Sequence, residues 1–99
     1  MSREIIFAVE ARLEFEDAIV WYNRQEPGLG DEFEAEVYKK LERIRAAPEH
    51  FQRAGKMRKA HLDRFSAYSI YFSVELDWIG VVSVFHGARN PAELKRRLR

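Results

Sequence analysis

The chain has 99 residues, 46% of them hydrophobic and 13% aromatic, which is enough apolar material for one compact domain over residues 1–99. It contains no cysteine. This excludes disulfides, zinc–thiolate sites and thiol nucleophiles, and it fits a reducing cytoplasm. No apolar run reaches the roughly 18 residues that a membrane-spanning helix needs, so no membrane association is predicted.

The first half of the chain predicts a strand followed by a helical hairpin. A β-branched and aromatic run makes Glu4–Val9 a strand. Apolar residues at helical spacing predict a helix from about Glu10 to Arg24 and a second from about Asp31 to Ala47, whose first residue can cap it. Proline and two glycines mark Glu26–Gly30 as the turn between them.

The second half predicts three strands and a short helix. After a polar loop at Glu49–Gly55, strands are expected at Met57–Leu62, Tyr68–Glu75 and Trp78–His86. A last helix can begin after Pro91. The predicted order is βααβββα. It describes an α+β domain in which the helical hairpin covers one face of a small, mainly antiparallel twisted sheet.

The formal net charge of +1 conceals an uneven distribution along the chain. Residues 1–50 carry 7 Lys/Arg and 12 Asp/Glu, a balance of −5, whereas residues 51–99 carry 10 and 4, a balance of +6. This polarity suggests that the basic half faces something anionic, such as nucleic acid or an acidic protein segment. The alternative is that the two halves neutralise each other within the fold.

Five side chains in the second half are candidates for catalysis. Nucleic acid is one anionic target that the charge distribution allows. If that target were RNA, its cleavage through the 2′-hydroxyl would need an acid, a base and cations around the phosphate. Arg58, Arg64 and Arg89 would supply the charge, and His86 or Tyr71 would carry protons. Arg58 and Tyr71 are expected to share the sheet face that the helices leave open. The same residues also suit the binding of an anionic target.

Each candidate also has a structural explanation. His86 can hydrogen-bond the loop that follows its strand, and Arg89 can pair with Asp17 or Glu14 and hold the fold closed. Tyr71 can pack instead of contacting a ligand. The basic terminal segment is either solvated or a docking surface for an acidic partner; its cations are Lys95, Arg96, Arg97 and Arg99.

No metal or cofactor is expected. Three scattered histidines without cysteine give no recognised ligand spacing. The glycine-rich turn at Pro27–Gly30 lacks the lysine and the preceding strand of a phosphate-binding loop.

Several short motifs, taken in order, resemble a known family. They are Ala18–Tyr22, Pro27–Gly30 with Phe33, Ile44 with Pro48, Arg58, Phe65, Tyr68–Phe72, and Val84–Pro91 with its His-Gly-x-Arg-x-Pro ending. Over about eighty residues this order resembles the RelE/ParE superfamily of small bacterial toxins. It is closest to the ParE-like branch often labelled plasmid-stabilisation protein.

The resemblance implies a toxin of a type II toxin–antitoxin system. ParE-like members bind and poison DNA gyrase, and a cognate antitoxin neutralises them within a toxin–antitoxin hetero-oligomer. The target- or antitoxin-binding residues would then be Arg58, Arg64, Tyr71, Arg89, Lys95, Arg96 and Arg97. RelE-like members instead cut mRNA on the ribosome, which would make Arg58, His86 and Arg89 catalytic. A third possibility is a non-toxic relative that acts only in antitoxin-bound autoregulation.

Overall fold

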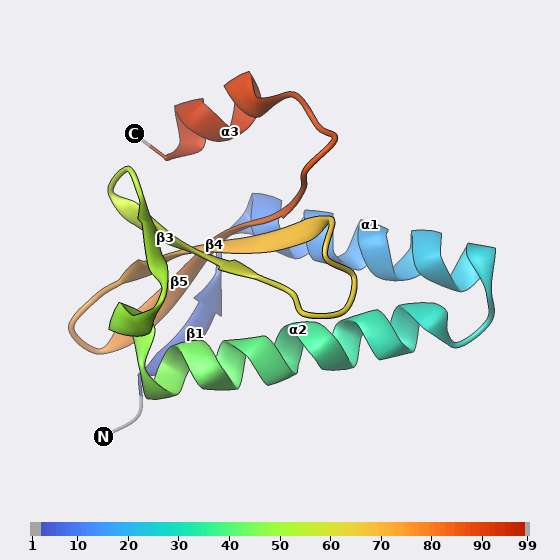
Figure 1. The fold of residues 1–99 in the computed structure, drawn as a ribbon, viewed down its shortest axis with the longest axis horizontal. Helices are drawn as coiled ribbons and strands as arrows, with labels where there is room; N and C mark the ends of the chain where they lie inside the picture. The colour runs from blue at the N-terminus through green and yellow to red at the C-terminus, as the bar shows by residue number, and fades with distance from the viewer. Residues whose placement is uncertain (1–2, 99) are drawn as a thin grey trace.

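The computed structural model describes residues 3–98 as an α+β fold with a helical hairpin, a five-stranded sheet and a short C-terminal helix (Figure 1). The class and packing expected from the sequence are confirmed. Arg99, the last cation of the basic terminal segment, lies outside the described residues. The elements are β1 (Glu4–Phe7), α1 (Val9–Gln25), α2 (Leu29–Ala46), a 3₁₀ turn (Pro48–His50), β2 (Gln52–Ala54), β3 (Met57–His61), β4 (Tyr68–Val74), β5 (Trp78–His86) and α3 (Pro91–Arg97).

The turn between α1 and α2 is tighter than the sequence predicted. Gly28 adopts a φ of 90°, a left-handed conformation that glycine tolerates, and α2 begins at Leu29. Asp31 therefore lies inside the first turn of α2, and its expected role as the cap is wrong. The Asn23 side chain accepts the Gly30 backbone N–H at 2.7 Å instead. A residue of α1 thus satisfies one of the free amides at the start of α2.

Gly30 lies at a close contact between the two helices. A Cβ at this position would lie 2.1 Å from the Ile19 carbonyl oxygen, so one helix would have to move. We expect Gly30→Ala to lower the free energy of unfolding by about 1–3 kcal/mol. Urea denaturation of Gly30→Ala beside Ala35→Ser, an exposed change on the same helix, checks this. Equal midpoints for the two variants would contradict the close approach.

The strand order is β1-β5-β4-β3-β2. β1 pairs in parallel with β5, and all other neighbours are antiparallel. β2 was not predicted, because Gln52–Ala54 is short, polar and part of the segment expected to be loop. It forms a hairpin with β3 around Gly55, whose φ of 64° permits the turn.

The helical hairpin packs on one face of the sheet and forms the main core. Phe15 of α1 and Phe33 of α2 share this core with Ile70 and Phe72 of β4, and each of these side chains is at most 1% exposed. Full burial of one such side chain contributes about 1.5–3 kcal/mol. The end of the hairpin that carries the turn between α1 and α2 extends past the sheet on the right of Figure 1.

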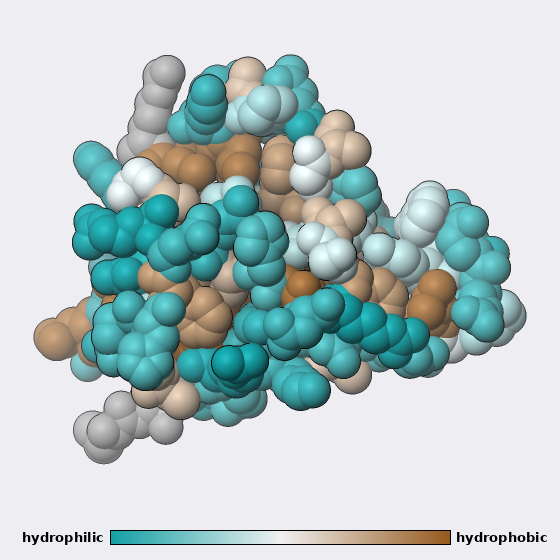
Figure 2. Space-filling model, viewed as in Figure 1, coloured by the Kyte–Doolittle hydropathy of each residue, from teal (hydrophilic) through white to brown (hydrophobic). Residues whose placement is uncertain are grey.

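The second face of the sheet is only partly open. α3 lies on the side of the molecule away from α2, and its Leu94 packs against Tyr71 and Phe85 (Figure 1). Apolar atoms are visible between α3 and the body of the protein in Figure 2. The expectation of a fully uncovered face is therefore corrected, because the C-terminal helix covers part of it. Within residues 3–98 no helix has the length and apolar character needed to cross a membrane.

Candidate partner-binding groove

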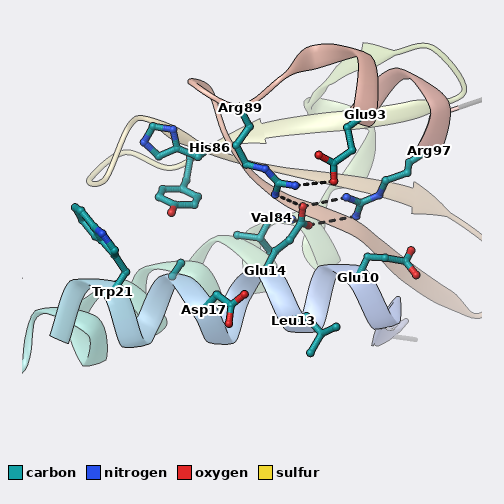
Figure 3. A pocket seen from close by; sticks show the side chains of 12 residues that line it. Glu10, Leu13, Glu14, Asp17, Trp21, Val84, His86, Arg89, Glu93 and Arg97 are labelled. Atoms are coloured by element: carbon teal, nitrogen blue, oxygen red, sulfur yellow. Dashed lines mark hydrogen bonds and ion pairs between the residues drawn. The ribbon is translucent and has the colours of Figure 1, made fainter. Parts of the chain in front are cut away.

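A groove of about 470 Å³ runs between α1, the end of β5 and α3 (Figure 3). Its wall on the α1 side includes Leu13, Ala18 and Trp21, and Val84 and His86 of β5 line the opposite side. The complete lining is Glu10, Leu13, Glu14, Asp17, Ala18, Trp21, Tyr68, Val84, His86, Arg89, Glu93 and Arg97.

The chain after β5 is held so that it closes one side of this groove. The Gly87 N–H donates to the Ala67 carbonyl at 2.8 Å and fixes the start of the loop. Asn90 then caps α3 by accepting the Ala92 N–H at 3.0 Å, and Pro91 occupies the first helical position. The Gly-x-Arg-x-Pro motif is therefore the connection that places α3 beside α1.

Glu14 of α1 joins three segments of the chain. Its carboxylate accepts hydrogen bonds from the Ser83 hydroxyl at 2.8 Å and the Val84 N–H at 3.1 Å. It also pairs with Arg89 at 2.5 Å and Arg97 at 2.9 Å (Figure 3). Only 10% of the Glu14 side chain is exposed, so these donors replace the water that the carboxylate lost on folding.

The ionisation of this cluster follows from its hydrogen bonds. Burial by itself raises the pKa of Glu14, but the hydrogen bonds from Arg97, Ser83 and Arg89 outweigh burial and hold the pKa below its ordinary value. Burial lowers the pKa of Arg89, whereas its bonds to Glu14 and Glu93 raise it, with a net increase. The cluster is therefore charged and paired at neutral pH.

Arg89 makes the kind of internal ion pair that was the structural alternative to a catalytic role. Arg89 pairs with Glu14, one of the two carboxylates suggested, and also with Glu93 at 2.7 Å.

His86 is half-buried, and its Nδ1 accepts the Ala88 N–H at 3.0 Å. Its ring contacts Tyr68 edge-on, with 4.9 Å between the ring centroids. Burial raises the pKa of Tyr68, so its hydroxyl stays protonated at neutral pH.

Arg58 does not lie where the sequence placed it. Arg58 is opposite Phe72, and Lys59 is opposite Tyr71. Residues directly opposite in an antiparallel pair share a face. Arg58 is therefore on the hairpin side, where it donates to the Phe51 carbonyl at 2.8 Å, and the expectation that it shares a face with Tyr71 is wrong.

The three proposed catalytic residues do not meet. Arg58 lines a small cavity with Arg53 and Met57, whereas His86 and Arg89 line the α1 groove. Arg58 and His86 pair with β4 residues four positions apart, a separation of roughly 13 Å along the strand. Residues 3–98 also hold no group of three or more His, Cys, Asp or Glu side chains able to bind a metal ion.

Some of the cations expected to bind a partner are paired within the protein, and others are not. Arg64 pairs with Glu32 at 2.6 Å, and Arg97 is held by Glu14. Lys95 and Arg96 are exposed on α3 and make no ion pair within the described part of the chain. The acidic and basic halves thus neutralise each other in part, and a subset of the basic residues is left free.

The sequence did not single out Leu13, which is 54% exposed, and it included Trp21, also 54% exposed, only as part of the Ala18–Tyr22 motif. Leu13 falls outside the apolar stripe that packs on the core. The available signal was that apolar residues stand among the charged ones on the exposed side of α1. Asp17 and Glu10 accompany these two side chains along the groove.

The fold is that of a small α+β protein with a groove between α1, β5 and α3 that is lined by both apolar and charged side chains. The chain matches the model of the family described as ParE toxin of type II toxin-antitoxin system, parDE, over residues 5–91. It belongs to that family. A solved structure described as the chromosomal ParDE TA system from P. aeruginosa has the same fold. Its TM-score is 0.73 with 11% identity, over 86% of this chain and 96% of that one. No curated protein matches the chain.

Proposed function

We propose that the protein is a cytoplasmic ParE-like toxin that arrests growth by binding DNA gyrase. The observation that favours binding of a protein target over cleavage of mRNA is a row of exposed apolar side chains on α1. Val9, Leu13 and Val20 are 71%, 54% and 48% exposed, and their spacing places them on one side of the helix. An apolar row of this kind on a surface helix is typical of a protein–protein contact.

A cognate antitoxin would neutralise the toxin by placing a helical or extended segment in the α1 groove. Leu13 and Trp21 would receive its apolar side chains, as in other complexes where a segment docks in a groove. The two proteins are expected to assemble into a toxin–antitoxin hetero-oligomer. mRNA cleavage remains the alternative for the superfamily. It has no support from the structure, because Arg58 lines a different cavity from His86 and Arg89.

Controlled expression in a bacterial host, with and without the neighbouring antitoxin gene, tests the proposal. We expect filamentous growth arrest, inhibition of supercoiling by purified gyrase, and rescue by the antitoxin. Leu13→Glu should relieve the arrest, because it places a charge in the apolar row; Glu16→Gln, an exposed change on the same helix, should not. Rapid loss of translation with cut mRNA would contradict the proposal, and so would growth without any defect.

A further inference from the structure

The outer edge of β1 is left without a neighbouring strand among residues 3–98. β1 lies at the end of the strand order and pairs with β5 on one side only. The Glu4 and Ala8 N–H groups donate to carbonyl oxygens on the β5 side, at 3.2 and 2.9 Å. Backbone groups alternate in direction along a strand. The N–H and C=O groups of Ile5 and Phe7 therefore point away from the sheet.

The two edges of the sheet differ in how well they resist pairing with another chain. Natural edge strands are protected by shortness, charged side chains, proline or bulges. β2, at one edge, is three residues long and carries Arg53 at its centre, with Arg58 directly opposite. β1, at the other, reads Glu-Ile-Ile-Phe, and its Ile6 is 44% exposed. β1 is therefore the edge suited to accept a further strand.

The side chains of β1 are divided between the two faces of the sheet. Ile5 and Phe7 pack against the core beneath the helical hairpin. Ile6 points to the other face, because side chains alternate along a strand. A strand that adds to β1 must therefore offer apolar residues on both faces. β1 of a second copy offers them at the same spacing.

A two-fold axis at Ile6 brings these residues together. In this antiparallel register Ile6 is opposite Ile6 of the second copy, and Ile5 is opposite Phe7 of the second copy. The Ile5–Phe7 pairs exchange both N–H···O bonds, whereas the Ile6 pair is of the non-hydrogen-bonded kind, in which side chains lie closest. The same patch is used on both copies, as in most dimers. Both helical hairpins then lie on one side of a continuous sheet.

The charges beside this edge also complement a second copy. A groove of about 300 Å³ lies next to β1, and its charged lining has two residues of each sign: Glu4, Arg12, Glu42 and Arg45. Glu42 pairs with Arg45 at 3.1 Å. Glu4 and Arg12 make no ion pair within the described residues. In the two-fold register Glu4 is opposite Ala8 of the second copy, one helical turn before its Arg12, so each copy supplies the charge that the other lacks.

We propose that two copies of the chain pair through β1 and form a symmetric dimer with one continuous sheet. The groove beside β1 shares no lining residue with the α1 groove, so the α1 groove of each copy stays open to its own partner. The dimer therefore does not depend on the identity of the protein target. Because β1 is short, the interface is small, and we expect a Kd of roughly 10–100 µM.

Disulfide cross-linking tests the register, because the chain has no cysteine of its own. Ile6→Cys places two thiols on a non-hydrogen-bonded pair, whose Cβ atoms approach to about 4.5 Å, within the reach of a disulfide. In a glutathione redox buffer at about 50 µM protein, it should form the covalent dimer about tenfold faster than Leu76→Cys. Leu76 is the control, because it is 88% exposed and lies between β4 and β5, away from the edge. Equal or faster cross-linking of Leu76→Cys would overturn the proposal.

Sedimentation velocity at increasing concentration gives an independent measurement. The unmodified protein should shift from monomer to dimer, and Ile6→Lys should raise the Kd about tenfold or more, because it sets two like charges opposite each other. Leu76→Lys, the same kind of change away from the edge, should leave the Kd unaltered, and thermal unfolding should show that both variants fold.

Two results would count against the dimer. One is an unmodified protein that stays monomeric up to about 500 µM. The other is hydrogen exchange in which the Ile5 and Phe7 amides exchange freely at high protein concentration and are protected only when the antitoxin is added. That result would assign the edge of β1 to the antitoxin and overturn the proposal.

Discussion

Replacing Trp21 with alanine is expected to weaken the complex with the cognate antitoxin roughly 30- to 150-fold, or about 2–3 kcal/mol. The side chain is 54% exposed, and its ring borders the groove between α1 and β5 (Figure 3). A tryptophan held at the edge of a groove is a frequent anchor of protein interfaces, because it buries a large area at a small cost in side-chain entropy.

Titration calorimetry with the purified antitoxin measures this effect. Trp78→Ala is the control, since Trp78 is also partly exposed but begins β5, whereas His86, which lines the groove, ends it. Those two positions are roughly 27 Å apart along the strand. The thermal unfolding midpoint of Trp21→Ala should change little, because the ring makes mainly an edge contact with Tyr22. Equal antitoxin affinities for the two alanine variants would contradict a docking segment in the α1 groove.

Glu14→Gln should lower the free energy of unfolding at neutral pH by about 2–3 kcal/mol. Removing one partner of a fully buried ion pair costs about 3–5 kcal/mol. The expected loss is smaller here because the Arg89 side chain is 36% exposed and regains some hydration. Arg97, only 16% exposed, loses its carboxylate partner, so α3 should detach more easily from α1.

The same substitution should change how stability depends on pH. The pKa of Glu14 is depressed in the folded protein, so its contribution is fully present above the ordinary value of 4.5 and is lost as pH falls through the folded pKa. Urea midpoints should therefore differ between wild type and Glu14→Gln at pH 7 and converge in acid. Glu16→Gln, on the exposed side of the same helix, should match wild type throughout. A difference in urea midpoint between wild type and Glu14→Gln that persists in strong acid would show that Glu14 acts by packing and not through its charge.

Local chemistry made most of the elements predictable. Trp78–His86 was predicted with its observed ends, because a nearly continuous apolar run of this length leaves few alternatives to a central strand. The hairpin helices were found from their apolar spacing, with ends displaced by one or two residues. β2 was missed because Gln52–Ala54 carries no apolar alternation, and only its pairing with β3 makes it a strand.

The sequence alone determined the fold class, the helical hairpin and the candidate residues at and after the end of β5, since these depend on spacing along the chain. Only the tertiary structure decided which cations are free. Glu14 is 75 residues from Arg89 and 83 from Arg97, and nothing local requires them to meet. The register of β3 against β4 put Lys59 beside Tyr71 and turned Arg58 away, because a shift of one residue moves a side chain to the other face of a sheet.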